Sequence, residues 1–232
     1  MKDNYNFISF KDENIEINFS TANNDMNFNC NVVEGRTNIN KIKNWFGIDE
    51  IAYLNQTHSD IICEYDKSIH EGDAIYTNEK NIAVGVFTAD CVPILIYDKR
   101  KEVVAAVHSG WKGTLKKITY KTISKIVNEY GSDPKDIKIY IGPHNRGCCY
   151  EFGREALEDF NNDELYKDLN IYSKGKLDLS KCIVEQILLA KVPKENIIDL
   201  QICTFCSKEY KMFSFRKDKG SSRLFSFIYI KK

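Results

Sequence analysis

Long apolar runs separated by short polar turns dominate the middle of the chain. Ile82–Phe87, Val92–Tyr97 and Val103–Val107 are continuous apolar segments, and Ile137–Ile141 is a further run of the same kind. Such runs are typical of strands that are covered on both faces, whereas half-exposed strands alternate apolar and polar residues. The pattern therefore predicts buried strands in these four segments.

Shorter runs predict further strands on both sides of this central region. The first two of them are predicted to form a hairpin, and the Asn-rich residues 20–38 that follow are predicted to be an irregular loop. The predicted strands are Tyr5–Phe10, Asn14–Phe19, Ile51–Leu54, Ile61–Tyr65, Ala74–Thr77, Ile197–Leu200, Met212–Phe215 and Leu224–Ile230.

Apolar residues at helical spacing predict four helices. These are Ile39–Phe46, Thr114–Tyr130, Glu151–Phe160 and Leu179–Ala190, and a glycine directly follows the first two, as is common at helix ends. Strands and helices alternate without a strict βαβ order, and no linker divides the chain. We therefore expect an α+β fold with a mixed sheet and helices on the outside, in a single domain over residues 1–232.

Composition narrows the functional classes. The 232 residues contain 33 Lys and Arg and 33 Asp and Glu, so the formal net charge is zero. The chain therefore lacks the excess of basic residues expected of a nucleic-acid-binding protein. No apolar stretch reaches the length of a transmembrane helix, and residues 1–5 are too polar for a signal peptide. We therefore expect a cytoplasmic protein with no membrane partner, in which the eight cysteines are reduced thiols.

Three segments each place one metal-ligating side chain at the end of an apolar run. His58 follows Ile51–Leu54, Cys91 lies in the turn between two buried strands, and His108 ends a strand. Zinc in catalytic sites commonly has three protein ligands and one open position. The competing interpretation is that the two histidines and the cysteine are ordinary residues that pack in the core or lie at the surface and bind no metal. Asp73 and Asp90 are candidates to orient an imidazole in such a site.

The sequence around these residues resembles the YfiH family, whose members are known as laccase-domain or polyphenol oxidase-like proteins and as purine nucleoside phosphorylases. The resemblance runs in family order from about residue 20 to the C-terminus. It is carried by the segments Asn55–Ser59, Asp73–Thr77, Thr88–Pro93, Ala106–Gly113, Tyr140–Pro143, Cys148–Gly153, Leu177–Leu179, Cys203–Thr204, Phe213–Asp218 and Lys219–Leu224.

The resemblance implies a layered α/β sandwich with mixed sheets and a zinc site at His58, Cys91 and His108. It also implies phosphorolysis of adenosine, inosine and methylthioadenosine, and deamination of adenosine, with a purine nucleoside and phosphate as partners. Two departures from the family pattern are the loop His144–Gly147 and a serine at position 109.

Both reactions need further side chains. The candidates for proton transfer are Asp73, Asp90 and His144, and the candidates for phosphate are Arg36, Arg146 and Arg223. Each arginine has the alternative of an ordinary surface position. Trp111 is expected to pack in the core. The alternative is that its ring stacks on the purine of the substrate.

Three other functions use the same residues. A copper-dependent, laccase-like polyphenol oxidase would have a His₂Cys copper site, but several copper centres need more than the four histidines of this chain. A metal-free cysteine hydrolase would use Cys91 as nucleophile and His108 as base. A zinc-stabilised interaction module would need a fourth ligand, with Cys149 or His144 as candidates. Cys203 and Cys206 form a Cys-x-x-Cys pair, but no second pair lies at zinc-finger spacing.

Overall fold

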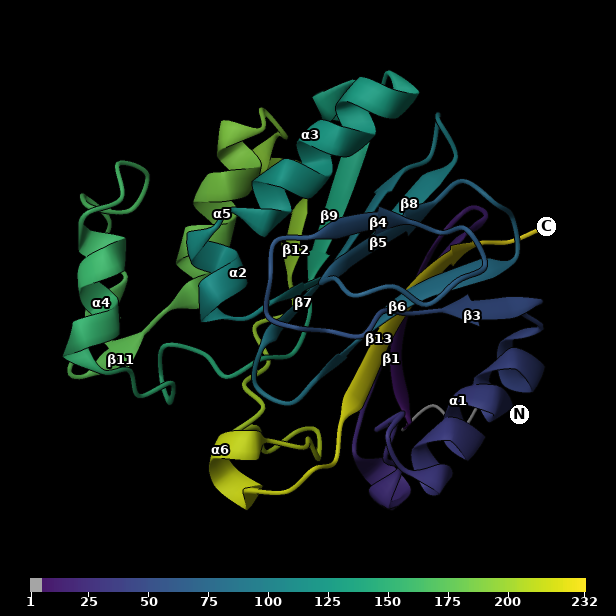
Figure 1. The fold of residues 1–232 in the computed structure, drawn as a ribbon, viewed down its shortest axis with the longest axis horizontal. Helices are drawn as coiled ribbons and strands as arrows, with labels where there is room; N and C mark the ends of the chain where they lie inside the picture. The colour runs from purple at the N-terminus through teal and green to yellow at the C-terminus, as the bar shows by residue number, and fades with distance from the viewer. Residues whose placement is uncertain (1–5) are drawn as a thin grey trace.

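The computed structural model describes residues 6–232 and contains two mixed β-sheets stacked face to face (Figure 1). The predicted start of the first strand at Tyr5 and the polar segment 1–5 lie outside the described residues. The five-stranded sheet has the order β1 (Phe7–Asp12), β2 (Ile15–Ser20), β13 (Leu224–Ile230), β6 (Ile82–Thr88) and β3 (Glu50–Ala52). The six-stranded sheet has the order β12 (Ile197–Asp199), β9 (Ile137–Ile141), β7 (Val92–Asp98), β8 (Val103–Ser109), β5 (Ala74–Thr77) and β4 (Ile62–Glu64).

The continuous apolar runs are strands with both faces buried, as predicted. Along β7, Leu95 and Tyr97 point into the core between the two sheets, and Ile94 and Ile96 point to the opposite face. The pairs β3–β6, β4–β5 and β9–β12 are parallel and the other pairs of the two sheets are antiparallel. The first two strands form the predicted hairpin, with Asp12 opposite Ile15 next to its turn.

Helices cover the outer face of each sheet (Figure 1). On the six-stranded sheet lie α2 (Trp111–Leu115), α3 (Ile118–Tyr130) and α5 (Leu179–Leu189), and on the five-stranded sheet lies α1 (Val33–Phe46). The remaining elements are α4 (Arg154–Asn161), the paired strands β10 (Tyr172–Ser173) and β11 (Lys176–Leu177), α6 (Phe215–Asp218), and the 3₁₀ turns Asn23–Asp25, Pro134–Asp136 and Lys194–Asn196. This order of layers, helix–sheet–sheet–helix, confirms the predicted α+β fold. Among the described residues, none of the helices is both long and apolar enough to cross a membrane.

The first helix begins earlier than predicted, so the irregular loop does not extend to residue 38. The additional first turns of α1 are polar and lack the apolar spacing that identifies a helix. They pack instead on the loop before the helix, where a Cβ on Gly35 would lie 1.9 Å from the Asn29 carbonyl oxygen. The Asn38 amide also donates to the Asn27 carbonyl at 2.8 Å.

The predicted helix 114–130 is broken at Lys117, which has a φ of 61°. The Gln186 side chain of α5 lies at the break. Its Nε2 donates to the Thr114 carbonyl at 2.9 Å, and its Oε1 accepts from the Thr119 N–H at 3.2 Å. The break is therefore stabilised by a distant side chain that the local spacing does not reveal.

The predicted strand 212–215 is wrong, because polar side chains there start the short helix α6. The Ser214 hydroxyl accepts from the Lys217 N–H at 3.2 Å, and the Asp218 carboxylate accepts from the Ser214 N–H at 3.2 Å. This reciprocal cap satisfies the free backbone groups at the start of the helix.

We expect Gln186→Ala to lower the free energy of unfolding by about 2–4 kcal/mol, because it leaves several buried polar groups without partners. These include the backbone N–H groups of Thr119 and Tyr120, which donate to the Gln186 Oε1 at 3.2 and 3.3 Å. The Thr114 carbonyl keeps its bonds from the Tyr166 hydroxyl and the Lys117 N–H. Urea unfolding measures the change. Glu185→Ala is the matched truncation one residue away on the same helix, and an equal loss in both variants would contradict the assignment.

Candidate active site

Two adjacent strands and one loop bring His58, Cys91 and His108 together. Cys91 immediately precedes β7, and His108 on β8 lies opposite Pro93 of β7 in the strand register. His58 lies in the loop between β3 and β4. The ligand atoms of the three side chains all lie within 4.8 Å of one another, with 3.8 Å between the Cys91 Sγ and the His58 Nε2.

The backbone is constrained on both sides of this cluster. His58 has a φ of 58° and Asp90 a φ of 96°, a region that non-glycine residues seldom occupy and that often marks functional sites. Gly110 follows β8, and a Cβ there would lie 3.0 Å from the His58 Cδ2 and 3.1 Å from the Cys91 Sγ. A side chain at position 110 would therefore press on two of the ligands, which would have to shift by a few tenths of an ångström.

The Asp73 carboxylate holds two of the three ligands in place. Its Oδ1 accepts from the His108 Nδ1 at 2.7 Å and from the His58 N–H at 3.1 Å. Its Oδ2 accepts from both the N–H and the hydroxyl of Ser59, each at 2.6 Å. Because Nδ1 of His108 is bonded to Asp73, Nε2 is left to face the cluster.

The charges of the cluster favour a thiolate. Burial by itself raises the pKa of Cys91, but the imidazole of His108 and then that of His58 lower it to about 6. Burial likewise opposes a charged His108, whereas Cys91 and Asp73 raise its pKa to about 9. Asp73 is fully buried, and its bonds to His108 and Ser59 outweigh that burial and hold its pKa well below the usual range.

This donor set fits a metal ion such as zinc. Imidazole nitrogen and thiolate sulfur are both common zinc ligands, and three of them leave a fourth position for water or substrate. Asp73 supplies the outer hydrogen bond that zinc-binding histidines usually make. His58 is exposed and Cys91 is half-buried, so the cluster is open to the solvent on one side.

A cavity of about 590 Å³ opens over the three ligands, which is within the size range of small-molecule sites. Two arginines, Arg216 and Arg223, line it together with aromatic rings and amides. The other lining residues include Asn29, Asn31, Asn55, Gln56, Phe87, Asp90, Tyr150 and Phe215.

Arg216 and Tyr150 were not among the site residues predicted from the sequence. The Arg216 guanidinium lies 5.0 Å from the centre of the Tyr150 ring and donates to the Glu151 carbonyl at 2.9 Å. Both residues belong to segments that carried the family resemblance, which was the available signal. Their proximity depends on the fold, because 65 residues separate Arg216 from Glu151.

Asp90 joins the cluster to the C-terminal part of the chain. Its Oδ1 accepts from the Thr204 hydroxyl at 2.7 Å and its Oδ2 from the Arg216 N–H at 2.7 Å. The structure therefore places Asp90 at the cavity wall, where it holds the loop of Arg216.

Four other candidates from the sequence do not line the cavity. His144 is buried, and its Nδ1 bonds to the Gly142 carbonyl at 2.8 Å; burial lowers its pKa to about 4. Arg146 forms a paired bond with the Asp199 carboxylate at 2.7 and 2.9 Å. Arg36 is exposed on α1, and the Trp111 ring packs edge-on against Phe152 with 5.7 Å between centres.

The positions of the four histidines do not provide several copper centres. His58 and His108 belong to one cluster, His70 is exposed and bonds to Asp66 at 2.9 Å, and His144 is bonded to the backbone. Among the described residues, the histidines therefore contribute to a single group of possible metal ligands.

Comparisons with known proteins identify the family of this chain and agree with its fold. A family model described as "multi-copper polyphenol oxidoreductase laccase" matches residues 12–231. A protein of Clostridium acetobutylicum named purine nucleoside phosphorylase is 56% identical over 99% of this chain and 98% of its own length. A prokaryotic protein named adenosine deaminase RL5 is 29% identical over 79% of this chain and 76% of its own.

The fold also matches a solved structure. The Bacillus licheniformis hypothetical protein YfiH superposes with a TM-score of 0.89 at 26% identity, over 100% of this chain and 98% of that one. The layered sheets and the family match thus define a laccase-domain α+β protein. The chain belongs to the YfiH, or multi-copper polyphenol oxidoreductase laccase, family.

We expect Gly110→Ala to weaken zinc binding roughly tenfold or more, because the added methyl group presses on His58 and Cys91. Competition with a chromogenic chelator measures the dissociation constant. Gly153→Ala is the control, since a Cβ at Gly153 meets nothing within 4 Å. Equal affinity in the Gly110 and Gly153 variants would contradict the proposed ligand set.

Proposed function

We propose that this protein is a zinc-dependent purine nucleoside phosphorylase that also deaminates adenosine. The proposed substrates are adenosine, inosine and methylthioadenosine, which phosphate converts to the free base and ribose 1-phosphate. The observation that carries the proposal is the open set of three ligands, His58, Cys91 and His108, at a cavity that two arginines line. The relatives named purine nucleoside phosphorylase and adenosine deaminase support the same class of reaction.

The chain supplies distinct groups for the two substrates. Phosphate carries negative charge, and the Arg216 and Arg223 guanidinium groups at the cavity wall are suited to bind it. Phe87, Tyr150 and Phe215 offer aromatic surface for the purine. In phosphorolysis a phosphate oxygen forms a bond to C1′ of the ribose while the bond to the purine nitrogen breaks, and the departing purine takes up a proton.

Zinc, when bound by His58, Cys91 and His108, would supply a Lewis acid that polarises an oxygen or nitrogen of the substrate or a water molecule. Asp73 positions His108 and the His58 loop, and its oxygens are occupied by these bonds. Asp90 is likewise engaged by Thr204 and Arg216. Of the three proton-transfer candidates, Asp73 and Asp90 thus serve to orient neighbours in this proposal, and His144 lies outside the cavity lining.

One alternative uses the same cluster without metal. The depressed pKa of Cys91 beside His108 is also what a cysteine nucleophile needs. A cysteine hydrolase would keep its activity after removal of metal by a strong chelator, whereas the zinc enzyme would lose activity and regain it with added zinc.

The decisive assay incubates the zinc-loaded protein with adenosine and phosphate and separates the products. Adenine with ribose 1-phosphate indicates phosphorolysis, and inosine indicates deamination. We expect His108→Ala to lower activity by at least about 100-fold and to weaken zinc binding, because it removes a ligand. His70→Ala removes an exposed imidazole and serves as the control. Lack of product from every purine nucleoside, with zinc bound, would contradict the proposed function.

We expect Arg223→Gln and Arg216→Gln each to raise the KM for phosphate about tenfold or more, because each removes one cation from the cavity wall. Initial rates at varied phosphate and saturating nucleoside measure this. Arg36→Gln makes the same change at an exposed position outside the cavity. A KM for phosphate that moves equally in all three variants would argue against a phosphate site here.

A further inference from the structure

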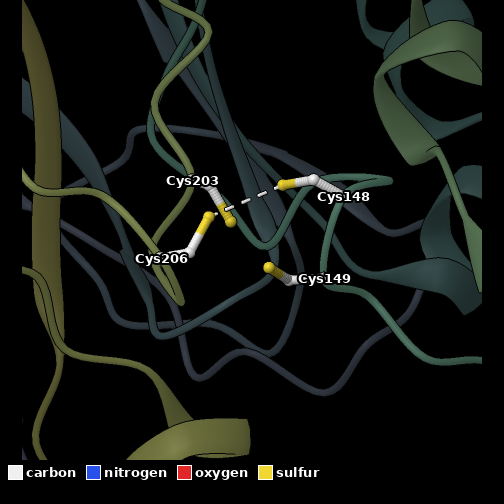
Figure 2. A group of neighbouring side chains, drawn as sticks. All are labelled: Cys148, Cys149, Cys203 and Cys206. Carbon is white, nitrogen blue, oxygen red and sulfur yellow. Dashed lines mark hydrogen bonds between the residues drawn. The ribbon is translucent and has the colours of Figure 1, made fainter.

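Four cysteines outside the candidate active site converge on one point. Cys148 and Cys149 lie in the loop after β9, and Cys203 and Cys206 lie in the turn after β12. All four Sγ atoms lie within 4.8 Å of one another, and Figure 2 shows the sulfurs pointing toward a common space. The sulfurs of Cys148 and Cys206 lie 3.7 Å apart, although the two residues are 58 positions apart in the sequence.

Backbone hydrogen bonds hold the two loops beside each other. The Thr204 N–H donates to the His144 carbonyl at 2.9 Å, and the His144 N–H donates to the Ile202 carbonyl at 3.2 Å. Arg146 pairs with Asp199 across the same two segments. The four sulfurs are therefore brought together by a scaffold that does not depend on a bond between them.

We propose that Cys148, Cys149, Cys203 and Cys206 bind one zinc ion as a closed tetrathiolate site. Zinc with four sulfur ligands at about 2.3 Å has sulfur–sulfur edges of about 3.8 Å, close to the 3.7 Å between Cys148 and Cys206. Cys203 and Cys206 supply the Cys-x-x-Cys spacing that is common in zinc sites. The adjacent Cys148 and Cys149 complete the four ligands.

The surroundings of Cys203 suit a metal-bound thiolate. The backbone N–H groups of Arg146, Cys206 and Phe205 donate to its sulfur. N–H bonds from the second and third residues after a cysteine stabilise negative charge on its sulfur. The Lys176 ammonium, which donates to the Cys148 carbonyl at 2.5 Å, adds positive charge beside a centre with four thiolates.

The spacing and exposure of the thiols favour a metal over disulfides. A disulfide joins two sulfurs at about 2.05 Å, whereas the sulfurs of Cys148 and Cys206 lie 3.7 Å apart. Cys148 and Cys206 are both exposed, and exposed free thiols are open to alkylation and oxidation. Zinc bound to all four would protect them.

The proposed ion has a structural role, since four protein ligands leave no position for substrate. It would join the loop that ends in Tyr150 to the segment that leads to Arg216. Tyr150 and Arg216 contact each other at the cavity wall. The proposal does not depend on which reaction the cavity supports.

The first experiment uses the unmodified full-length protein, purified under reducing conditions without added metal. Native mass spectrometry counts the zinc ions per chain, and brief alkylation followed by peptide mapping identifies the protected cysteines. We expect Cys148, Cys149, Cys203 and Cys206 to be protected until the protein is unfolded with a chelator. Rapid alkylation of Cys148 and Cys206 in the native protein would overturn the proposal. So would a disulfide among the four, seen as a loss of two hydrogens, or iron in place of zinc.

The second experiment separates this site from the candidate active site. The double variant Cys148→Ser with Cys206→Ser should contain one zinc ion fewer per chain and keep any zinc held by His58, Cys91 and His108. His108→Ala should show the reverse, with the four cysteines still protected. Cys63→Ser removes a thiol on β4 that belongs to neither group and should not change the zinc count. An unchanged zinc count in the double variant would also overturn the proposal, and the first experiment remains decisive if that variant does not fold.

Discussion

The candidate active site depends on one buried carboxylate. Asp73 accepts hydrogen bonds from the His108 ring and from the backbone of the His58 loop, so a single side chain sets the position of two of the three ligands. Removing a carboxylate from water costs several kcal/mol unless its oxygens are bonded. Ser59 and the Thr57 N–H supply further donors. The loop of residues 57–59 therefore folds around Asp73 because the carboxylate needs its N–H groups. The left-handed conformation of His58 is one result of that fold.

Much of the fold follows from local patterns, and the exceptions share a cause. The apolar segments that form β6, β7 and β8 are buried on both faces. Their hydrophobic pattern was therefore enough to predict these strands. The start of α1, the break at Lys117 and the helix α6 were mispredicted because each depends on polar hydrogen bonds. At Lys117 the deciding group is Gln186, which lies far away in the sequence. Local spacing identifies strongly periodic elements and does not identify partners that only the fold brings near.

The same distinction applies to the site. His58, Cys91 and His108 were recognisable because their chemistry is unusual at the ends of apolar runs, and the structure brings them together. Arginines have no such signal, since most of them lie at the surface whatever their role. Of the three arginines chosen from the sequence, Arg223 lines the cavity, whereas Arg146 is paired with Asp199. Arg216 reaches the cavity because Asp90 accepts its backbone N–H, a contact that no local pattern encodes.

The two sulfur-containing clusters differ in the property that separates catalytic from structural zinc, which is the number of protein ligands. The cluster of His58, Cys91 and His108 has three donors and borders a cavity, so a bound ion there would have room for a substrate. The cluster of Cys148, Cys149, Cys203 and Cys206 has four donors and is absent from the cavity lining. In the sequence, the Cys203–Cys206 spacing alone was weak evidence for a zinc site. The other two cysteines are adjacent in the chain and do not form a second Cys-x-x-Cys pair. The parallel bridge between His144 and Cys203 and the pair of Arg146 with Asp199 make the two cysteine pairs neighbours, and these contacts exist only in the folded chain.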